Sequence, residues 1–282
     1  MKLIKSYIVL ILICIVGFFL FMYPIISNHW NSKHSSKVIV EYDDYVQKYD
    51  AEESKKIIEE VNLYNLSLLE RENEFKLSKE QQEKYNSLLN IDNLGNIGYI
   101  SIKKINVNIP IYHGISDEVL VNNVGHLEWS SLPIGGESTH AVLSAHNGLI
   151  TSRLFTDLRK LNEGDTFVIH VLNEELIYEV DQIRTVKPDD NSYLKIEKGK
   201  DLVTLITCTP YGINTDRLLV RGHRIIDNKE YSNFAPNGYL INKYIEAGLL
   251  SIIPVCLFII IILINKKTKK EKSVLWRILK YF

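Results

Sequence analysis

Two long apolar stretches near the ends of the chain confine any folded domain to the residues between them. Residues 7–26 carry no charge and follow two lysines, and this length suffices for a helix that spans a bilayer. Residues 247–264 form a second apolar run, followed by five lysines. The positive-inside rule then places both termini in the cytoplasm and residues from about 29 to 246 outside it. We therefore predict a two-pass protein of the cell membrane with an extracytoplasmic folded domain.

Two other interpretations of these stretches fit less well. A cleaved signal peptide has a shorter apolar core and a small-residue cleavage site, whereas residues 27–30 read Ser-Asn-His-Trp. A buried core helix could account for residues 247–264, but the lysine cluster that follows favours a membrane segment.

The overall charge excludes one class of partner. The chain has 33 basic and 34 acidic residues, a formal net charge of −1. A nucleic-acid-binding domain shows a basic surplus or stripe, so we expect no nucleic-acid partner.

The region between the apolar stretches changes in pattern near Asp92. Before it, residues 38–90 are highly charged, with apolar residues at helical spacing, and Ser78 with Gln81 forms a capping box. We expect a helical arm there. After it come seven short runs of β-branched and aromatic residues separated by turn residues: 98–102, 109–113, 140–144, 166–172, 176–180, 202–207 and 218–225.

These runs predict a mainly β domain with antiparallel strands. Sheets of many short strands usually close into a barrel or a sandwich, which removes their edges. Residues 152–161 space their apolar side chains as a short amphipathic helix lying across the sheet.

Cys208 is the only cysteine between the apolar stretches. Cys14 and Cys256 lie inside those stretches, so Cys208 has no disulfide partner within the domain. It ends a strand-like run just before Pro210 and Gly212, where a thiol can face a loop. The alternative is a small buried hydrophobe, as free cysteines often are.

A catalytic thiol needs a proton-transfer partner and a donor for the oxyanion. His146 ends another strand-like run and precedes Asn147 and Gly148, so its ring can project into a loop. His170 reads instead as a residue within a strand, and His223 as a solvated strand end.

Arg217 lies nine residues after Cys208. A hairpin through the intervening turn residues brings it back beside the thiol, with a planar fork of donors. Arg221 is on the same strand face four residues deeper, and Arg224 faces the other way. The alternative for each is an exposed strand charge.

Several segments together resemble the sortases, the cysteine transpeptidases of Gram-positive cell surfaces. The resemblance rests on TLITC (204–208), NTDRLLVRG (214–222) and AVLSAH (141–146), and it covers about residues 97–226 nearly continuously. Further runs, together with the second apolar segment, resemble class C sortases, which polymerise pilins: INVNIPIYHG (105–114), GHLE (125–128), LPIGGESTH (132–140), LFTDL (154–158) and VKPDD (186–190).

The resemblance implies a closed eight-stranded β-barrel and a role for each candidate residue. Cys208 would be the nucleophile, His146 the general acid and base, and Arg217 the donor to the oxyanion and the substrate backbone. The substrate would be a Leu-Pro-x-Thr-Gly-like sorting signal, cleaved between Thr and Gly through a thioacyl intermediate. The partners would be pilin subunits with that signal and the acceptor lysine of a second pilin. No cofactor and no metal is implied.

Three alternatives stay open. A housekeeping sortase would attach surface proteins to a peptidoglycan precursor. A cell-surface cysteine peptidase of the papain type places its Cys before its His, the reverse of the order here. A non-catalytic receptor with two anchors would not need an Arg beside a lone thiol.

The apolar runs, the change of pattern near Asp92 and the resemblance together define domain boundaries. We predict a cytoplasmic N-terminus (1–6), a transmembrane anchor (7–26), an extracytoplasmic helical arm with a lid-like region (27–96), a sortase catalytic β-barrel (97–227), a linker (228–246), a second transmembrane helix (247–264) and a basic cytoplasmic tail (265–282).

One feature departs from class C sortases. Their lid commonly carries an Asp-Pro-aromatic motif, and this arm has no Asp-Pro dipeptide. Phe75 is the aromatic residue between the two helical runs. It would be either a weak plug of the site or a residue that packs one helix on the other.

Overall fold

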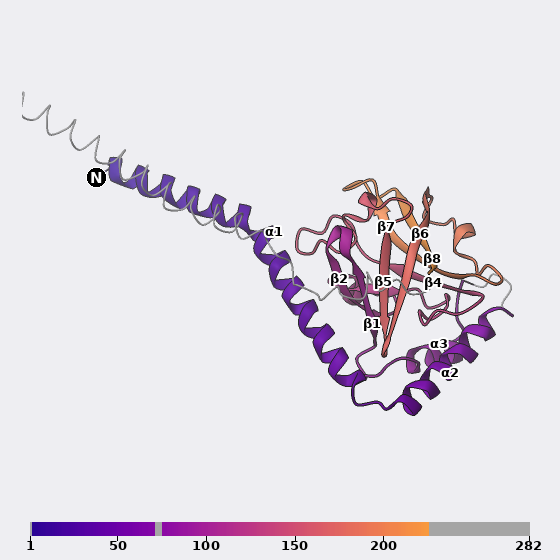
Figure 1. The fold of residues 1–282 in the computed structure, drawn as a ribbon. Coiled ribbons are helices and arrows are strands. Elements are labelled where there is room, and N and C mark those ends of the chain that lie inside the picture. The colour runs from indigo at the N-terminus through magenta and orange to yellow at the C-terminus, as the bar shows by residue number, and fades with distance from the viewer. Residues whose placement is uncertain (1, 71–74, 226–282) are drawn as a thin grey trace, which may run out of the picture. The chain divides into compact units, whose positions relative to one another are not determined.

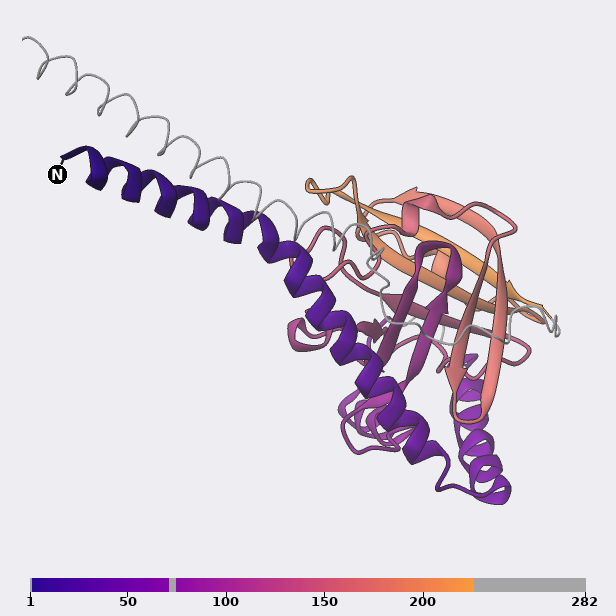
Figure 2. The same cartoon turned by 60° about the vertical axis from the view of Figure 1, so that its left-hand side comes forward.

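The computed structural model describes residues 2–70 and 75–225, drawn as ribbons in Figures 1 and 2. Three helices come first: α1 (Lys2–Val46), α2 (Ala51–Leu68) and α3 (Lys79–Ser87). A β domain follows, with the strands β1 (Asn96–Ile102), β2 (Val107–His113), β3 (Val124–His126), β4 (Thr139–Ser144), β5 (Thr166–Val171), β6 (Glu174–Val186), β7 (Asp201–Thr209) and β8 (Asp216–Arg224).

The connections between strands contain only short helices. These are η1 (Lys103–Ile105), α4 (Asp117–Leu120), η2 (Leu158–Lys160) and η3 (Ser192–Leu194).

The eight strands form a closed barrel in the order β1-β2-β3-β4-β7-β8-β6-β5. This confirms the predicted mainly β fold and its closure. The antiparallel prediction is wrong for two of the pairings, because β2 pairs with β3 and β4 pairs with β7 in parallel. A parallel pair needs a long crossover, which α4 and its flanking turns supply for β2 and β3. The segment between residues 145 and 200 supplies it for β4 and β7.

The helical arm packs against one side of the barrel. The capping box of Ser78 and Gln81 is present at the start of α3, and Asp50 with Glu53 forms another at the start of α2. The C-terminal half of α1 lies along β1 and β2 (Figure 2). Its buried Tyr42 hydroxyl donates to the carbonyl of Ile97 in β1 and accepts from an amide after β5. The arm therefore continues the core of the barrel.

The segment predicted as an amphipathic helix over residues 152–161 is not one. It forms turns and the single 3₁₀ turn η2. The amide of Phe155 donates to the carbonyl of His146, 3.2 Å away, so it is not available to a helical carbonyl four residues earlier. Its apolar residues are nevertheless buried as the spacing predicted: Leu154, Phe155, Leu158 and Leu161.

The membrane anchors stay predictions. Within the part of the chain that the structure describes, no helix is long and apolar enough to cross a bilayer. The second predicted anchor (247–264), the linker and the basic tail lie outside the described residues.

Several histidines are buried uncharged in the β domain. Burial lowers the pKa of His126 to about 3, and that of His140 and His170 to about 4. His126 contacts the Tyr85 hydroxyl of α3 at 2.9 Å and the Ser131 carbonyl at 2.8 Å. The neutral imidazoles therefore tie the arm and the loops to the strands.

The lowered pKa values of these histidines predict that the protein loses stability in weak acid. Their pKa is near 6.5 in the unfolded chain, so below pH 6.5 the unfolded state binds more protons than the folded state. The free energy of unfolding should fall between pH 6.5 and 5 by up to ~1.4 kcal/mol per pH unit for each histidine. Urea unfolding at pH 7, 6 and 5 measures this. His126→Gln should lower stability at every pH but give a shallower slope, and an unchanged slope would contradict the assignment.

Candidate active site

Cys208 lies at the end of β7, on the outer face of the barrel. Side chains alternate between the two faces of a strand, and Leu205 points into the core whereas Ile206 joins a separate outer cluster. Cys208 follows Ile206 by two residues and therefore shares its outer face. The free thiol is partly exposed.

Arg217 is the direct partner of Cys208 across the β7–β8 hairpin. The turn between the strands is closed by hydrogen bonds from the amides of Ile213 and Asn214 to the carbonyl of Pro210. Residues opposite each other in an antiparallel pair share a face, so the guanidinium and the thiol lie on the same side. The sequence prediction that a hairpin returns Arg217 to the thiol is confirmed.

His146 reaches the same end of the sheet from β4. Ser144 pairs with Ile206 in the parallel β4–β7 ladder, and the amide of Ala145 extends the ladder to the carbonyl of Ile206 at 3.1 Å. The Thr207 hydroxyl donates to the carbonyl of Ala145 at 2.8 Å. His146 comes next in the chain and is partly exposed beside the end of β7. The three predicted residues therefore meet at adjacent strand ends, and their catalytic roles stay predictions.

Asn147 is a site residue that sequence reasoning missed. Its side-chain amide donates to the carbonyl of Cys208 at 2.8 Å, and the residue is 9% exposed. It thereby fixes the backbone after His146 to the backbone of the nucleophile. The only signal in the sequence was its position next to His146.

Gly148 continues this close contact. Its φ of +81° is in the left-handed region, which favours glycine, and an added Cβ would lie 3.3 Å from the ring of Tyr211. The turn after His146 therefore packs directly on the hairpin that follows Cys208.

Arg221, on the same strand as Arg217, is engaged elsewhere. Its guanidinium makes two hydrogen bonds of 2.9 Å to Asp181 and one of 2.8 Å to Glu197. Hydrogen bonding to Asp181 is the main reason that the pKa of Arg221 is raised. Arg217 instead donates to the backbone carbonyls of Asn214 and Asp216. Among the described residues no carboxylate forms an ion pair with Arg217, so its remaining N–H donors are available to a ligand.

A groove of about 240 Å³ runs along the outer face from Arg217. Most of its apolar lining belongs to a cluster that is separate from the barrel core: Leu127, Val186, Leu194, Ile206 and Leu219. We call this cluster, which also contains Trp129 and Val142, the outer cluster. The rim carries Lys187, Pro188 and Asp190 from the segment after β6. The groove can hold an extended peptide with apolar side chains.

Phe75 lies against this outer cluster. Its ring meets the indole of Trp129 edge to face, with centroids 4.9 Å apart. Phe75 thus packs on the barrel surface, and its aromatic partner belongs to the barrel and not to another helix of the arm.

Two other histidines of the β domain contact side chains of neighbouring strands. His170 stacks on Tyr99 of the neighbouring strand with centroids 4.2 Å apart, and His140 contacts the hydroxyl of Thr204 at 2.7 Å. His223 is partly exposed near the end of β8. The described residues contain no group of three or more His, Cys, Asp or Glu side chains that could hold a metal ion.

The chain matches known proteins throughout this region. Residues 100–225 match the family model for the sortase domain. The solved sortase C1 of Streptococcus agalactiae is 53% identical, with a TM-score of 0.67, and the match covers 68% of this chain and 100% of that one. Sortase C of Streptococcus pneumoniae is 41% identical, with a TM-score of 0.59, over 68% of this chain and 97% of that one.

Curated relatives match over a shorter region. Sortase D of Bacillus subtilis is 30% identical over 131 residues, which is 45% of this chain. The chain spans less than two thirds of the length of the curated relatives it matches first, 63% for that sortase D.

The closed eight-stranded barrel is that of the cysteine transpeptidases. The chain belongs to the sortase family, and its structural neighbours are class C sortases.

Substitution of Asn147 tests the site geometry directly. Asn147→Ala removes the donor to the Cys208 carbonyl, and a loss of about 1 kcal/mol in stability is expected. Turnover of a sorting-signal peptide should fall by about tenfold or more, because small misplacements of reacting groups are costly. Asn62→Ala, on the exposed face of α2, is the matched control. Equal turnover in the two variants would show that the Asn147 bond does not serve the site.

Substitution of Phe75 tests whether the arm covers the groove. An aromatic pair contributes about 1 kcal/mol, so losing it should raise access to the site by about fivefold. The rate at which iodoacetamide labels Cys208 should therefore rise by that factor in Phe75→Ala and equally in Trp129→Ala. If labelling is unchanged in both, the ring pair only packs the arm on the barrel.

Proposed function

We propose that the chain is a cysteine transpeptidase that cleaves a Leu-Pro-x-Thr-Gly-like sorting signal and transfers it to a pilin lysine. The observation that carries this proposal is the register of two strand pairs. One ladder sets Arg217 opposite Cys208, and the other brings His146 beside the end of β7. The apolar groove that starts at Arg217 supplies a place for the substrate.

The first half of the reaction forms a thioacyl enzyme. The Cys208 thiolate attacks the Thr carbonyl carbon, and the carbonyl π electrons move to the oxygen. Arg217, which no carboxylate among the described residues pairs with, donates to that oxyanion. Collapse of the intermediate breaks the Thr–Gly bond, and His146 protonates the departing Gly amine.

The second half transfers the acyl group. His146 takes a proton from the incoming lysine amine, which attacks the thioester carbonyl carbon. A new amide forms, and the Cys208 sulfur leaves as the thiolate. The two-step reaction consumes no ATP, because the energy of the cleaved peptide bond is kept in the thioester.

The outer cluster supports recognition of the Leu-Pro part of the signal. A Leu and a Pro need apolar contacts, and the groove offers Ile206, Leu219 and Leu194 next to Arg217. Polar and charged side chains at the rim, such as Lys187, can contact the peptide backbone.

Pilin assembly is favoured over attachment to a peptidoglycan precursor. The solved neighbours at 53% and 41% identity are sortases C, and the S. pneumoniae enzyme was described in terms of its pilin substrate specificity. Matches to curated sortases A stand at 29% and 25% identity. The housekeeping role is the second candidate.

We also propose that the enzyme is anchored in the cell membrane with its barrel outside the cytoplasm. The charge-free run of residues 7–26 and its flanking lysines support this. Large apolar side chains of α1 are exposed in that part of the helix, among them Leu20 at 70% and Phe21 at 67%, and a lipid environment would cover them.

The full chain in detergent should cleave a fluorogenic Leu-Pro-x-Thr-Gly peptide and form a thioacyl adduct on Cys208. Cys208→Ala should abolish cleavage, and Arg217→Lys should lower kcat by about a hundredfold because a point charge replaces the fork. Arg221→Lys is the matched control on the same strand. Mass spectrometry detects the adduct.

Two additions separate the alternatives. An added amine should divert the product to the aminolysis adduct, and a hydrolysed product alone would favour a peptidase. A pilin with a sorting signal and an acceptor lysine should give covalent ladders on a denaturing gel. Attachment to a peptidoglycan precursor without ladders would favour the housekeeping role. If neither turnover nor a thioacyl adduct is observed, the non-catalytic receptor remains as the interpretation.

A further inference from the structure

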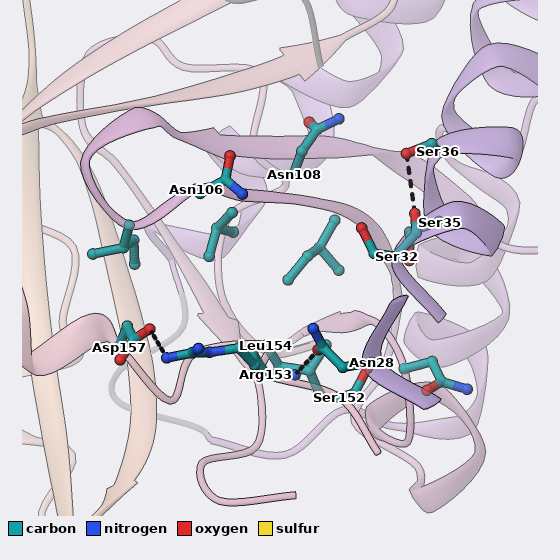
Figure 3. Close-up of a pocket in the computed structure, with 14 residues that line it drawn as sticks. Asn28, Ser32, Ser35, Ser36, Asn106, Asn108, Ser152, Arg153, Leu154 and Asp157 are labelled. Atoms are coloured by element: carbon teal, nitrogen blue, oxygen red, sulfur yellow. Dashed lines mark hydrogen bonds and ion pairs between the residues drawn. The ribbon is translucent and has the colours of Figure 1, made fainter. Parts of the chain in front are cut away.

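Helix α1 makes two hydrogen bonds to the loop that follows His146. We call residues 147–157 the His146 loop. The Asn28 side-chain oxygen accepts from the amide of Arg153 at 3.0 Å, and the Asn31 side-chain amide donates to the carbonyl of Thr151 at 2.9 Å. Figure 3 shows Asn28 next to Arg153 at one side of a cavity between α1 and the barrel. Both asparagines come directly after the predicted membrane anchor.

The chemistry of these two bonds is fixed by their backbone partners. A backbone amide can only donate, so Asn28 must present its oxygen to Arg153. A backbone carbonyl can only accept, so Asn31 must present its nitrogen to Thr151. An aspartate would therefore keep the first bond and lose the second.

The far end of the loop is tied to His146 itself. The amide of Phe155 donates to the carbonyl of His146 at 3.2 Å, and the amide of Gly148 donates to the hydroxyl of Thr156 at 3.0 Å. The bond from Asn147 to Cys208 holds the near end. Only one residue, Leu154, lies between the Arg153 amide, held by Asn28, and the Phe155 amide, held by His146.

The tip of the loop has little apolar burial to hold it. Ile150 is 67% exposed, and Thr151 is only partly buried. A cavity of about 40 Å³, lined largely by Ser and Asn side chains, separates α1 from the strands here (Figure 3). Leu149 is partly buried and packs on the barrel core, and fully buried apolar side chains resume at Leu154 and Phe155. Residues 150–153 between them bury no large apolar side chain, so polar bonds hold this part of the loop, and α1 provides two of them.

We propose that Asn28 and Asn31 are positioning residues that set the His146 loop, and through it His146, against Cys208. This rests on the proposed transpeptidase function. The turns of α1 that follow the predicted membrane anchor would then help to position the active site. The catalytic rate of the enzyme, as well as its place in the membrane, would depend on this helix.

Two near-isosteric substitutions test the proposal with opposite expectations. In the full chain in detergent, Asn31→Asp should lower kcat for the sorting-signal peptide by about tenfold with KM within twofold, because the loop loses its donor and meets a second acceptor. Asn28→Asp should retain kcat within about twofold, whereas Asn28→Ala should lower it. Asn62→Ala on α2 is the control for an asparagine outside the framework.

A merely structural role gives a different result. The thermal midpoints of Asn28→Ala and Asn31→Asp would then fall while kcat per folded enzyme stays at the wild-type value, and this outcome overturns the proposal. Equal kcat in Asn31→Asp and the wild type overturns it as well.

A second measurement does not need substrate turnover. The pH profile of Cys208 alkylation reports the Cys–His pair, and amide exchange at residues 149–155 reports the loop. Asn31→Asp should change the profile and speed the exchange, and Asn28→Asp should do neither. If the wild type shows no turnover but these differences appear, the proposed function fails and the coupling of α1 to the loop holds. If they are absent, the coupling fails.

Discussion

The parallel pairing of β4 with β7 is the constraint on which the site depends. It joins two segments more than sixty residues apart in the chain and sets Ser144 beside Ile206. The next residues on each strand continue the match through the Ala145 amide and the Thr207 hydroxyl. A shift of one residue in this ladder would turn Cys208 into the barrel core, since strand side chains alternate with a period of two. The buried His140, which contacts Thr204 across the same pair of strands on the outer face, supports that register.

The alternation that fills the core also builds the groove. Inward residues of β4, β7 and β8 belong to the barrel interior, and outward ones form the outer cluster. The outward residues Val142, Leu194, Ile206 and Leu219 expose at most 8% of their surface, so the outer cluster is itself packed and gives the groove a firm apolar floor. Phe75 of the arm contacts Trp129 of the same cluster, so the arm and a bound substrate peptide would share this face of the barrel.

The sequence predicted the local parts of this arrangement well. Seven of the eight strands were found from their β-branched runs, and the turn residues between Cys208 and Arg217 predicted the hairpin. The three-residue strand β3 was missed because so short a run carries no periodicity. Parallel pairings depend on contacts between distant segments, so a local pattern cannot reveal them. The helix predicted over residues 152–161 was wrong for a related reason: a hydrogen bond from Phe155 to a residue outside the segment overrides its helical spacing. Asn28, Asn31 and Asn147 carry no sequence signal at all, since their partners are backbone groups of other elements.

Two of the three arginines of β8 show what only the structure can decide. Arg217 and Arg221 share a strand face and a residue type, and sequence alone gives either of them the same chemistry. Arg221 is bonded to Asp181 and Glu197, so its field is largely cancelled and its donors are occupied. Arg217 is held by backbone carbonyls of its own turn, and its neighbour Asp216 is paired with Lys187 at 2.6 Å. A carbonyl oxygen that gains negative charge at Cys208 therefore meets an arginine that forms no ion pair with a carboxylate of the described residues. Asp181 and Glu197 bind Arg221, and Asp216 binds Lys187. Arg217 is therefore left available, and this division of partners makes the strand end suited to an oxyanion.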